Sequence, residues 1–295
     1  SSDLDVIVNA DVTMTLGNIT LESTGNDVTL ATSKSVIATA GALTITAAND
    51  VDVNSAEADG LKGANGITVT AGLAIDIDAT MTTTNNDINL TGLKVETAAL
   101  VAGTGDITVN ATNDLLTDVS TIGSITSAGD LTLENGYLKL GTSALAGNLI
   151  VNGDSDLLST GDISANAVIL STSNDVSFAG GSLTTGLVAG GGSGDFNLGT
   201  KVLNTGDDDL SITTGAGNDT MILNDTTIVA NTAKFIVNAG DGKNNITITD
   251  VGAGSTVTTG GGADIISVGD ATKVVLSTGG GDDIITTTAI TELSL

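Results

Sequence analysis

The stretch Gly105-Asp106-Ile107-Thr108-Val109 shows the pattern that decides the fold, a Gly-Asp pair followed by alternating apolar and polar residues. With Asn or Gly before the aspartate, the signature returns at 26–30, 49–53, 86–90, 129–133, 174–178 and 194–198, and a variant with Gly66 in place of the aspartate occupies 65–69. Alternation with period 2 is typical of strands with one buried face. Gly, Asn and Asp are typical of the turns between such strands.

The copies mostly follow one another at intervals of about 20 residues, a length typical of stacked repeats. A unit of two or three short strands cannot bury its apolar face alone, so neighbouring units must stack. We therefore predict an all-β fold, a right-handed parallel β-solenoid (β-helix) of about 15 coils, each advancing about 4.8 Å. A β-sandwich is the alternative, but its strands require no repeat of fixed length.

The composition excludes several classes of function. The chain of 295 residues has 35 acidic and 8 basic residues, a net charge of -27, and no His or Cys. The absence of His and Cys excludes the common zinc, haem and iron–sulfur sites and the catalytic triads that depend on His. The acidic charge and the aromatic content of 1% argue against nucleic acid, which is bound by basic patches and stacking.

The hydropathy of the chain favours a folded protein that is not inserted in a membrane. The hydrophobic content is 40% and the mean hydropathy is +0.31, which argues against disorder. No apolar run approaches the length of about 18 residues that a membrane span requires. No signal peptide is visible, and the chain begins at Ser1 and stops within an alternating run, so we interpret it as a processed product or an excised piece.

Four denser motifs occupy the C-terminal quarter, each rich in Gly and closed by Asp or Asn. They are Thr214–Asp219, Ala239–Asn244, Thr259–Asp264 and Thr278–Asp283. Glycines permit turns that direct carbonyl groups at a small cavity, and Asp adds a hard anionic oxygen, so the donor set suits Ca²⁺ better than Mg²⁺. Because Asn244, Asp264 and Asp283 recur at the repeat length, a solenoid would place them along one edge, about 5 Å apart.

These motifs resemble the calcium-binding nonapeptide of repeats-in-toxin (RTX) proteins, Gly-Gly-x-Gly-x-Asp-x-apolar-x, with Thr or Ala in the first position. The resemblance implies calcium-binding β-roll character in residues 206–295, continuous with a β-solenoid in residues 1–205. It assigns the metal ligands to Gly215, Gly217, Asp219, Gly240, Gly242, Asn244, Gly260, Gly262, Asp264, Gly279, Gly281 and Asp283. The motifs come once per repeat of about 20 residues rather than about every nine, so only one edge would carry calcium.

Residues 1–205 are similar to the loose repeats of filamentous-haemagglutinin-type and other bacterial β-solenoid surface proteins, including surface-layer proteins. The segments 42–47 and 129–133 carry this resemblance. We interpret the aspartates of the short signature as turn residues that bond their own backbone rather than as metal ligands. They are Asp27, Asp50, Asp87, Asp106, Asp130, Asp175 and Asp195.

We therefore expect an extracellular, calcium-dependent structural protein at the cell surface, a homopolymer subunit of a bacterial surface layer or matrix fibre. The alternative is a passenger segment of a secreted adhesin that binds a glycan or host surface, and a cell-surface polysaccharide is the second expected partner. Catalysis is not expected, because Tyr137 and the scattered lysines form no cluster like those of the polysaccharide lyases that use β-helices.

Thr-x-Thr segments suggest a third class, the binding of ice or another flat surface. They occur at 13–15, 44–46, 68–70 and 247–249. From the sequence they do not fall on consecutive coils at a fixed spacing. We therefore interpret them as threonines on the exposed faces of strands.

Overall fold

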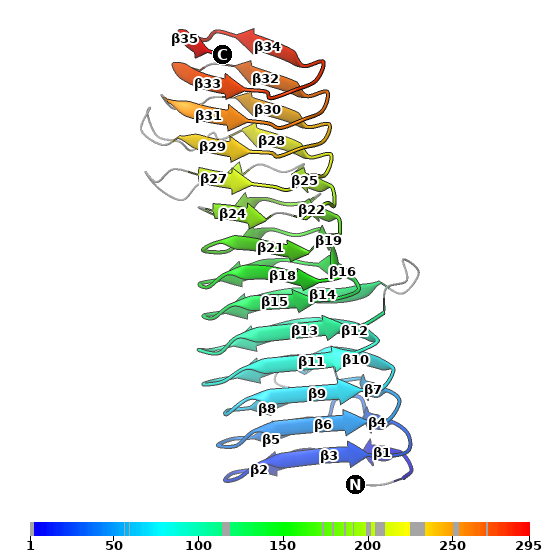
Figure 1. The fold of residues 1–295 in the computed structure, drawn as a ribbon. Coiled ribbons are helices and arrows are strands. Elements are labelled where there is room, and N and C mark those ends of the chain that lie inside the picture. Colours follow the sequence, from blue (N-terminus) through cyan, green and yellow to red (C-terminus); the bar gives the residue numbers. More distant parts are fainter. Residues whose placement is uncertain are drawn as a thin grey trace. The chain divides into compact units, whose positions relative to one another are not determined.

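The computed structural model describes residues 3–55, 57–58, 60–113, 119–172, 174–178, 180–185, 187–190, 192–198, 202–203, 210–224, 234–249, 254–269 and 271–295. Every regular element in these residues is a strand, and the fold is a parallel β-solenoid of about 13 turns (Figure 1). The chain divides into two compact units, Ser1–Leu149 and Ile150–Leu295. The predicted boundary between residues 205 and 206 lies outside the described residues and stays a prediction.

In the first unit each coil adds one strand to layer A and one or two strands to layer B. Layer A contains β3 (Ile19–Ser23), β6 (Leu43–Ala47), β9 (Ile67–Ala71), β11 (Ile88–Gly92), β13 (Ile107–Ala111) and β15 (Leu131–Glu134). Layer B contains β1 (Val6–Val8), β2 (Val12–Met14), β4 (Val28–Leu30), β5 (Val36–Ala38), β7 (Val51–Val53), β8 (Leu61–Gly63), β10 (Ala74–Thr83), β12 (Lys94–Ala102), β14 (Ser120–Ser127), β16 (Tyr137–Leu140) and β17 (Ser143–Leu145).

The second unit is built in the same way, after β18 (Leu149–Gly153) at the boundary. Its layer A contains β21 (Val168–Thr172), β24 (Leu187–Gly190), β27 (Leu210–Thr213), β29 (Phe235–Asn238), β31 (Ser255–Thr258), β33 (Lys273–Ser277) and β35 (Glu292–Ser294). Its layer B contains β19 (Asp156–Ser159), β20 (Ile163–Ser164), β22 (Val176–Phe178), β23 (Leu183–Thr184), β25 (Phe196–Leu198), β26 (Val202–Leu203), β28 (Thr220–Asn224), β30 (Asn245–Thr249), β32 (Ile265–Gly269) and β34 (Ile284–Thr288).

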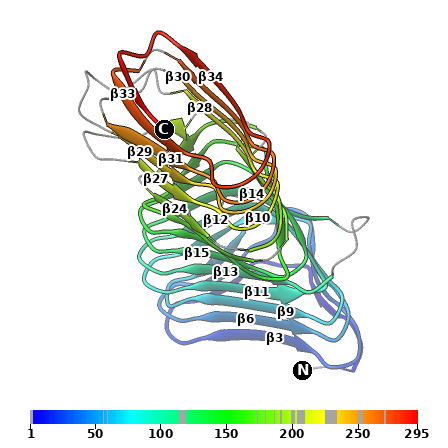
Figure 2. The ribbon, with the colours of Figure 1, turned by 45° about the horizontal axis from the view of Figure 1, so that its top comes forward.

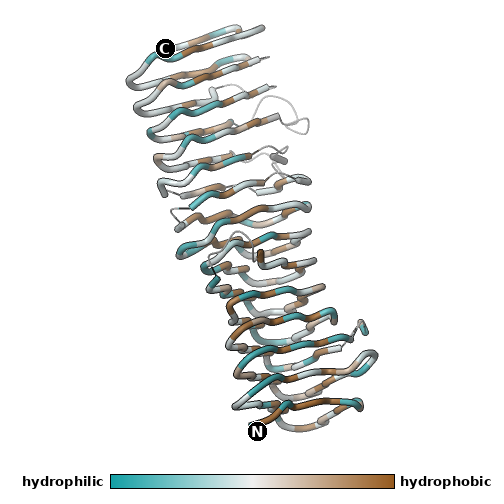
Figure 3. Tube along the Cα trace, turned by 90° about the vertical axis from the view of Figure 1, so that its right-hand side faces the viewer, coloured by the Kyte–Doolittle hydropathy of each residue, from teal (hydrophilic) through white to brown (hydrophobic). Residues whose placement is uncertain are grey.

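The core is a set of apolar ladders between the two layers of each unit. In the first unit Leu43 and Ile45 of β6 pair with Ile67 and Val69 of β9, and all four side chains are at most 1% exposed. Hydrophobic and hydrophilic segments are interspersed along the chain trace (Figure 3), and burial of such an aliphatic side chain contributes about 1.5–3 kcal/mol. The predicted stacking of strands with one buried apolar face is therefore confirmed for the described core.

Coil length explains why there are fewer coils than the predicted 15 or so. Leu43 and Ile67 are register partners on consecutive coils, as are Ile19 and Leu43, so these coils are each 24 residues long. The Asp signature also changes layer. Asp50 precedes β7 in layer B, whereas Asp87 precedes β11 in layer A. What looks like a single repeat of about 20 residues is thus a mixture of two layers.

Candidate metal centre in the glycine-rich turns

The predicted glycine ligands form two files in the turns before β28, β30, β32 and β34. One file contains Gly217, Gly242, Gly262 and Gly281, and the other contains Gly215, Gly240, Gly260 and Gly279. A Cβ added to Gly262 would lie 1.8 Å from the carbonyl oxygen of Gly242, and its φ is +143°. Consecutive coils therefore approach too closely for a side chain at Gly262, and glycine is required at this position.

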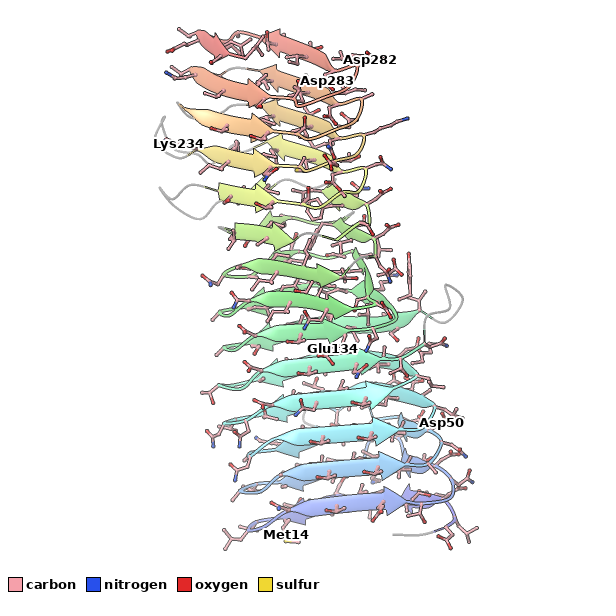
Figure 4. All side chains as sticks on the ribbon, viewed as in Figure 1. Met14, Asp50, Glu134, Lys234, Asp282 and Asp283 are labelled. Atoms are coloured by element: carbon pink, nitrogen blue, oxygen red, sulfur yellow. The ribbon has the colours of Figure 1, made fainter. Side chains whose placement is uncertain are left out.

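The Asp and Asn that close the motifs occupy the first inward position of the stack rather than a turn position. Pairing of Asn197 with Thr220 aligns Asp219 with Phe196, which is a core side chain. Asp219, Asn244 and Asp264 are at most 1% exposed. At the turn before β34, Asp283 is half-buried, and its neighbour Asp282 is exposed (Figure 4). The motif aspartates thus replace apolar side chains in the core.

These inward side chains are joined to the backbone of the preceding coil. Each Oδ1 atom accepts a hydrogen bond from the backbone N–H of the residue at the same register position on the preceding coil. The donor–acceptor pairs are Phe196 to Asp219 at 3.0 Å, Asp219 to Asn244 at 3.2 Å, Asn244 to Asp264 at 2.9 Å and Asp264 to Asp283 at 3.1 Å. We call this set the buried file. It satisfies backbone donors that would otherwise be buried without a partner, a cost of about 1–3 kcal/mol each.

The second polar atom of each side chain distinguishes the positions. Asp219 Oδ2 accepts a hydrogen bond from the Thr214 hydroxyl, and Asn244 Nδ2 donates to the carbonyl of Gly240 at 3.2 Å. Asp264 Oδ2 is buried and has no hydrogen-bond partner. An ionised carboxylate oxygen in that state is costly unless a cation contacts it. Asp264 therefore fits a metal ion, whereas Asp219 and Asn244 are already satisfied.

The carbonyl groups of the motif glycines are further oxygen atoms in these turns. Within the described residues, no backbone hydrogen bond between turns reaches the carbonyl oxygens of Gly242 and Gly262, while those of Gly240 and Gly260 accept bonds from Gly260 and Gly280. Carbonyls and a carboxylate are the ligands of hard cations. No group of three or more acidic side chains that could hold a metal occurs in the part of the chain that the structure describes, so such a site depends on backbone oxygens.

Burial also shifts the ionisation of Asp219. Desolvation raises the pKa of Asp219 above its ordinary value, and the charge of Asp195 adds to this, while the hydrogen bonds from Thr214 and Phe196 oppose it. The carboxyl group is therefore more readily protonated in the folded chain than in the unfolded chain. In contrast, the exposed Asp162 accepts bonds from the backbone and hydroxyl of Ser182, which lower the pKa of Asp162.

The aspartates of the short signature behave differently. They face the turn, and each Oδ1 accepts a bond from the backbone N–H of the following coil rather than from its own turn. Asp50 accepts from Ala74 at 2.8 Å, Asp87 from Asp106 at 3.0 Å, and Asp106 from Asp130 at 2.8 Å. Asp27, Asp130, Asp175 and Asp195 do the same. We call this set the turn file. From the sequence we expect these aspartates to bond the backbone of their own turn. That expectation is wrong, because their hydrogen-bond partner is the backbone of the following coil.

Sequence reasoning missed three residues that shape the site. Thr214 and Thr259 open two of the motifs and are buried, and their hydroxyls bond Asp219 and the carbonyl of Thr278 respectively. Asn218 continues the turn file, accepting a bond from the N–H of Lys243 at 2.9 Å. The recurrence of Thr at the first motif position was the available signal for the first two.

The cavity at the first motif is small. A cavity lined by Phe196, Thr214 and Gly215 has a volume of about 20 Å³, enough for one water molecule but not for an organic substrate. Among the described residues there is no helix with the length and hydropathy of a membrane span. Comparisons with protein-family models, curated proteins and solved structures gave no match to this chain.

Proposed function

We propose that the chain is an extracellular, calcium-dependent structural protein of a bacterial surface layer or matrix fibre. The observation that supports it most is the unpartnered Oδ2 of Asp264, which is buried at the end of a glycine-rich motif. A calcium ion there would be held by Asp264, Asp283 and the carbonyls of Gly242 and Gly262. It would supply the positive charge that the carboxylate lacks. Asp219 and Asn244, whose polar atoms already have partners, stay outside this proposed site.

Calcium is the preferred ion because the donors are all oxygens in turns of irregular geometry. Ca²⁺ accepts six to eight oxygen ligands with loose geometry, whereas Mg²⁺ requires a near-ideal octahedron and retains several waters. An ion bound only by the folded chain stabilises it by about 2.7 kcal/mol at a concentration of 100 times its dissociation constant. In a solenoid this gain is local, because each coil contacts only its neighbours.

Homopolymer formation is part of the proposal. At a net charge of -27, subunits repel one another, so bound calcium would favour their association.

The test compares wild type with Asp264→Asn in calcium and in EGTA. Asn keeps the acceptor for the Asn244 N–H and adds a donor, as Asn244 does toward Gly240. We expect wild type to gain about 5 °C or more in Tm from calcium, and the variant to gain almost nothing. In EGTA the variant should be at least as stable as wild type. Calorimetric titration should show loss of calcium binding in the variant.

Asp50→Asn is the matched control, because it changes an aspartate of the turn file without touching the motifs. It should retain the full calcium response. Limited proteolysis should show residues 210–295 loosening in EGTA before residues 3–149. A wild-type Tm that is the same in calcium and in EGTA would contradict the proposed calcium dependence. Sedimentation across a calcium series tests the homopolymer, and a monomer at all concentrations would contradict that part alone.

A further inference from the structure

The outer face of layer A in the first unit carries an uncharged field of threonine and asparagine. We define the threonine field as the outward positions of β6, β9, β11 and β13. They are Thr44, Thr46, Thr68, Thr70, Asn89, Thr91, Thr108 and Asn110. Thr20 and Thr132 extend it by one coil at each end, where Glu22 and Glu134 are the first charges. Layer A strands of the first unit lie over one another in Figure 2.

The field is a two-column lattice. Thr44 pairs with Thr68, and Thr46 pairs with Thr70. The columns continue through Asn89 and Thr91 to the next coil, with no register shift in these pairings. The repeat is about 4.8 Å across coils and about 6.6 Å along each strand. From the sequence we expect that the Thr-x-Thr segments do not fall on consecutive coils. For 44–46 and 68–70 this is wrong, because the two segments are register partners on consecutive coils.

Charge is segregated to the opposite layer of the same coils. On layer B, Asp52, Asp76 and Glu96 are register partners on three consecutive coils. Burial and the neighbouring carboxylates of Glu96, Asp78 and Asp52 raise the pKa of Asp76. The pairing there also contains a register shift between Ile77 and Thr80. Layer B is thus charged and irregular where layer A is neutral and regular.

These properties limit what the threonine field can bind. The three cavities described for this chain are lined by residues outside the field. The field has no charge to attract an ion and no aromatic ring to stack on a sugar. Its four coils span about 19 Å by about 10 Å, roughly 190 Å². That area is well below the roughly 800 Å² per partner of a stable protein interface, which argues against a second copy of the chain.

A partner that fits is neutral, flat, periodic and made of hydrogen-bonding units. We propose that the threonine field binds the surface of ice. Each threonine offers a methyl group and a hydroxyl group at fixed positions, because branching at Cβ restricts χ1 and little rotamer entropy is lost on binding. In the described structure no protein group forms a hydrogen bond with the hydroxyls of Thr44, Thr46, Thr68 and Thr70.

This inference does not depend on the proposed calcium site. The threonine field lies in the first unit, and the motif turns lie in the second. The apolar ladder behind the field consists of fully buried aliphatic side chains, including Leu43, Ile67 and Ile88. The lattice is therefore set by packing. Ice binding should be the same in calcium and in EGTA, whatever happens to the second unit.

The experiment grows ice slowly from a dilute solution of the whole chain and measures the fraction of protein that enters the ice. We expect wild type to be enriched in ice relative to an acidic protein of similar size. The double variant Thr68→Tyr and Thr70→Tyr, in the middle of the lattice, should lose this enrichment by about tenfold or more. Thr82→Tyr is the matched control, because Thr82 is an outward threonine on layer B of the same unit and should leave enrichment unchanged.

Circular dichroism and Tm verify that all variants remain folded, since outward strand positions tolerate tyrosine. Exclusion of wild type from ice would overturn the proposal. Equal loss in the Thr82→Tyr control would also overturn it, because the effect would not belong to the field. Sedimentation with crystalline cellulose or chitin is measured in parallel. Binding there that depends on Thr68 and Thr70, without enrichment in ice, would assign the field to a crystalline polysaccharide instead.

Discussion

The turn file and the buried file use the same chemistry in opposite settings. In both, an aspartate Oδ1 accepts a backbone N–H from a neighbouring coil. Asp50 lies out of phase with the inward Val51 and Val53, so its carboxylate stays at the turn (Figure 4). Asp264 lies in phase with Ile266 and Val268, so its carboxylate enters the core. A shift of one residue relative to the inward positions of the strand therefore decides whether the aspartate bonds at the turn or is buried in the core.

The largest expected effect concerns the glycines that make room for the buried file. Gly262→Ala should destabilise the second unit by about 3 kcal/mol or more, because the new Cβ meets the Gly242 carbonyl and the φ of +143° is unfavourable for alanine. Gly280→Ala is the control in the adjacent turn, where a Cβ meets nothing within 4 Å. It should stay within about 0.5 kcal/mol of wild type. Denaturant unfolding measures both, and equal losses would show that turn crowding is not the cause.

The next effect concerns the charge of Asp219. Its pKa is raised in the folded chain, so protonation favours folding. This contribution is full below the unfolded pKa near 3.8 and is lost as the pH rises through the folded pKa. Asp219→Asn keeps the acceptor for Phe196 and removes the buried charge. We expect its Tm at neutral pH to rise by about 2–4 °C, with the gain shrinking in acid.

Asp162→Asn is the matched comparison for pH, because the pKa of Asp162 is lowered. Ionised Asp162 stabilises the folded chain above its unfolded pKa, and this contribution is lost as the pH falls through the folded pKa. The variant should therefore not gain stability at neutral pH. Thermal melts of both variants across acid and neutral pH would reveal the opposite slopes. A rise for Asp162→Asn equal to that for Asp219→Asn would mean that overall charge, not burial, controls both.

The smallest effect is expected in the turn file. Asp50→Ala removes the acceptor of the Ala74 N–H at a partly exposed site, where water replaces the lost bond. The cost should be about 0.5–1.5 kcal/mol, confined to the first unit and equal in calcium and EGTA. Hydrogen exchange of the Ala74 amide localises the change. A calcium-dependent loss at Asp50 would erase the distinction between the two files.

The fold was predictable because alternation and repeat length are local properties of the sequence. Ladders such as Leu43 on Ile67 follow from them directly. The number of coils was less accessible, because the signature before β7 and the signature before β11 belong to different layers. Only the pairing of strands shows which copies stack. The same reason hid the threonine field, whose columns depend on register rather than on spacing in sequence.

The candidate site was predictable in part. The phase of Asp219, Met221 and Leu223 was already in the sequence and could have indicated a buried aspartate. The unpartnered oxygen could not be predicted. Thr214 and Thr259 open similar motifs, yet Thr214 bonds the aspartate of its own motif, whereas Thr259 bonds the carbonyl of Thr278. The acceptor that each threonine hydroxyl bonds depends on the position of the adjacent coil, which cannot be predicted from the local sequence.

The direction of the inter-coil hydrogen bonds gives each file a polarity for growth. In the turn file the acceptor belongs to the earlier coil, so the carboxylate of Asp87 is already in place when the next coil, which carries the N–H of Asp106, is added. In the buried file the acceptor belongs to the later coil, so the N–H of Asn244 stays without its partner until the coil of Asp264 is in place. The turn file therefore favours the addition of coils toward the C-terminus. The buried file favours a nucleus at Asp283 and addition toward Asp219, so the two files favour opposite orders of assembly.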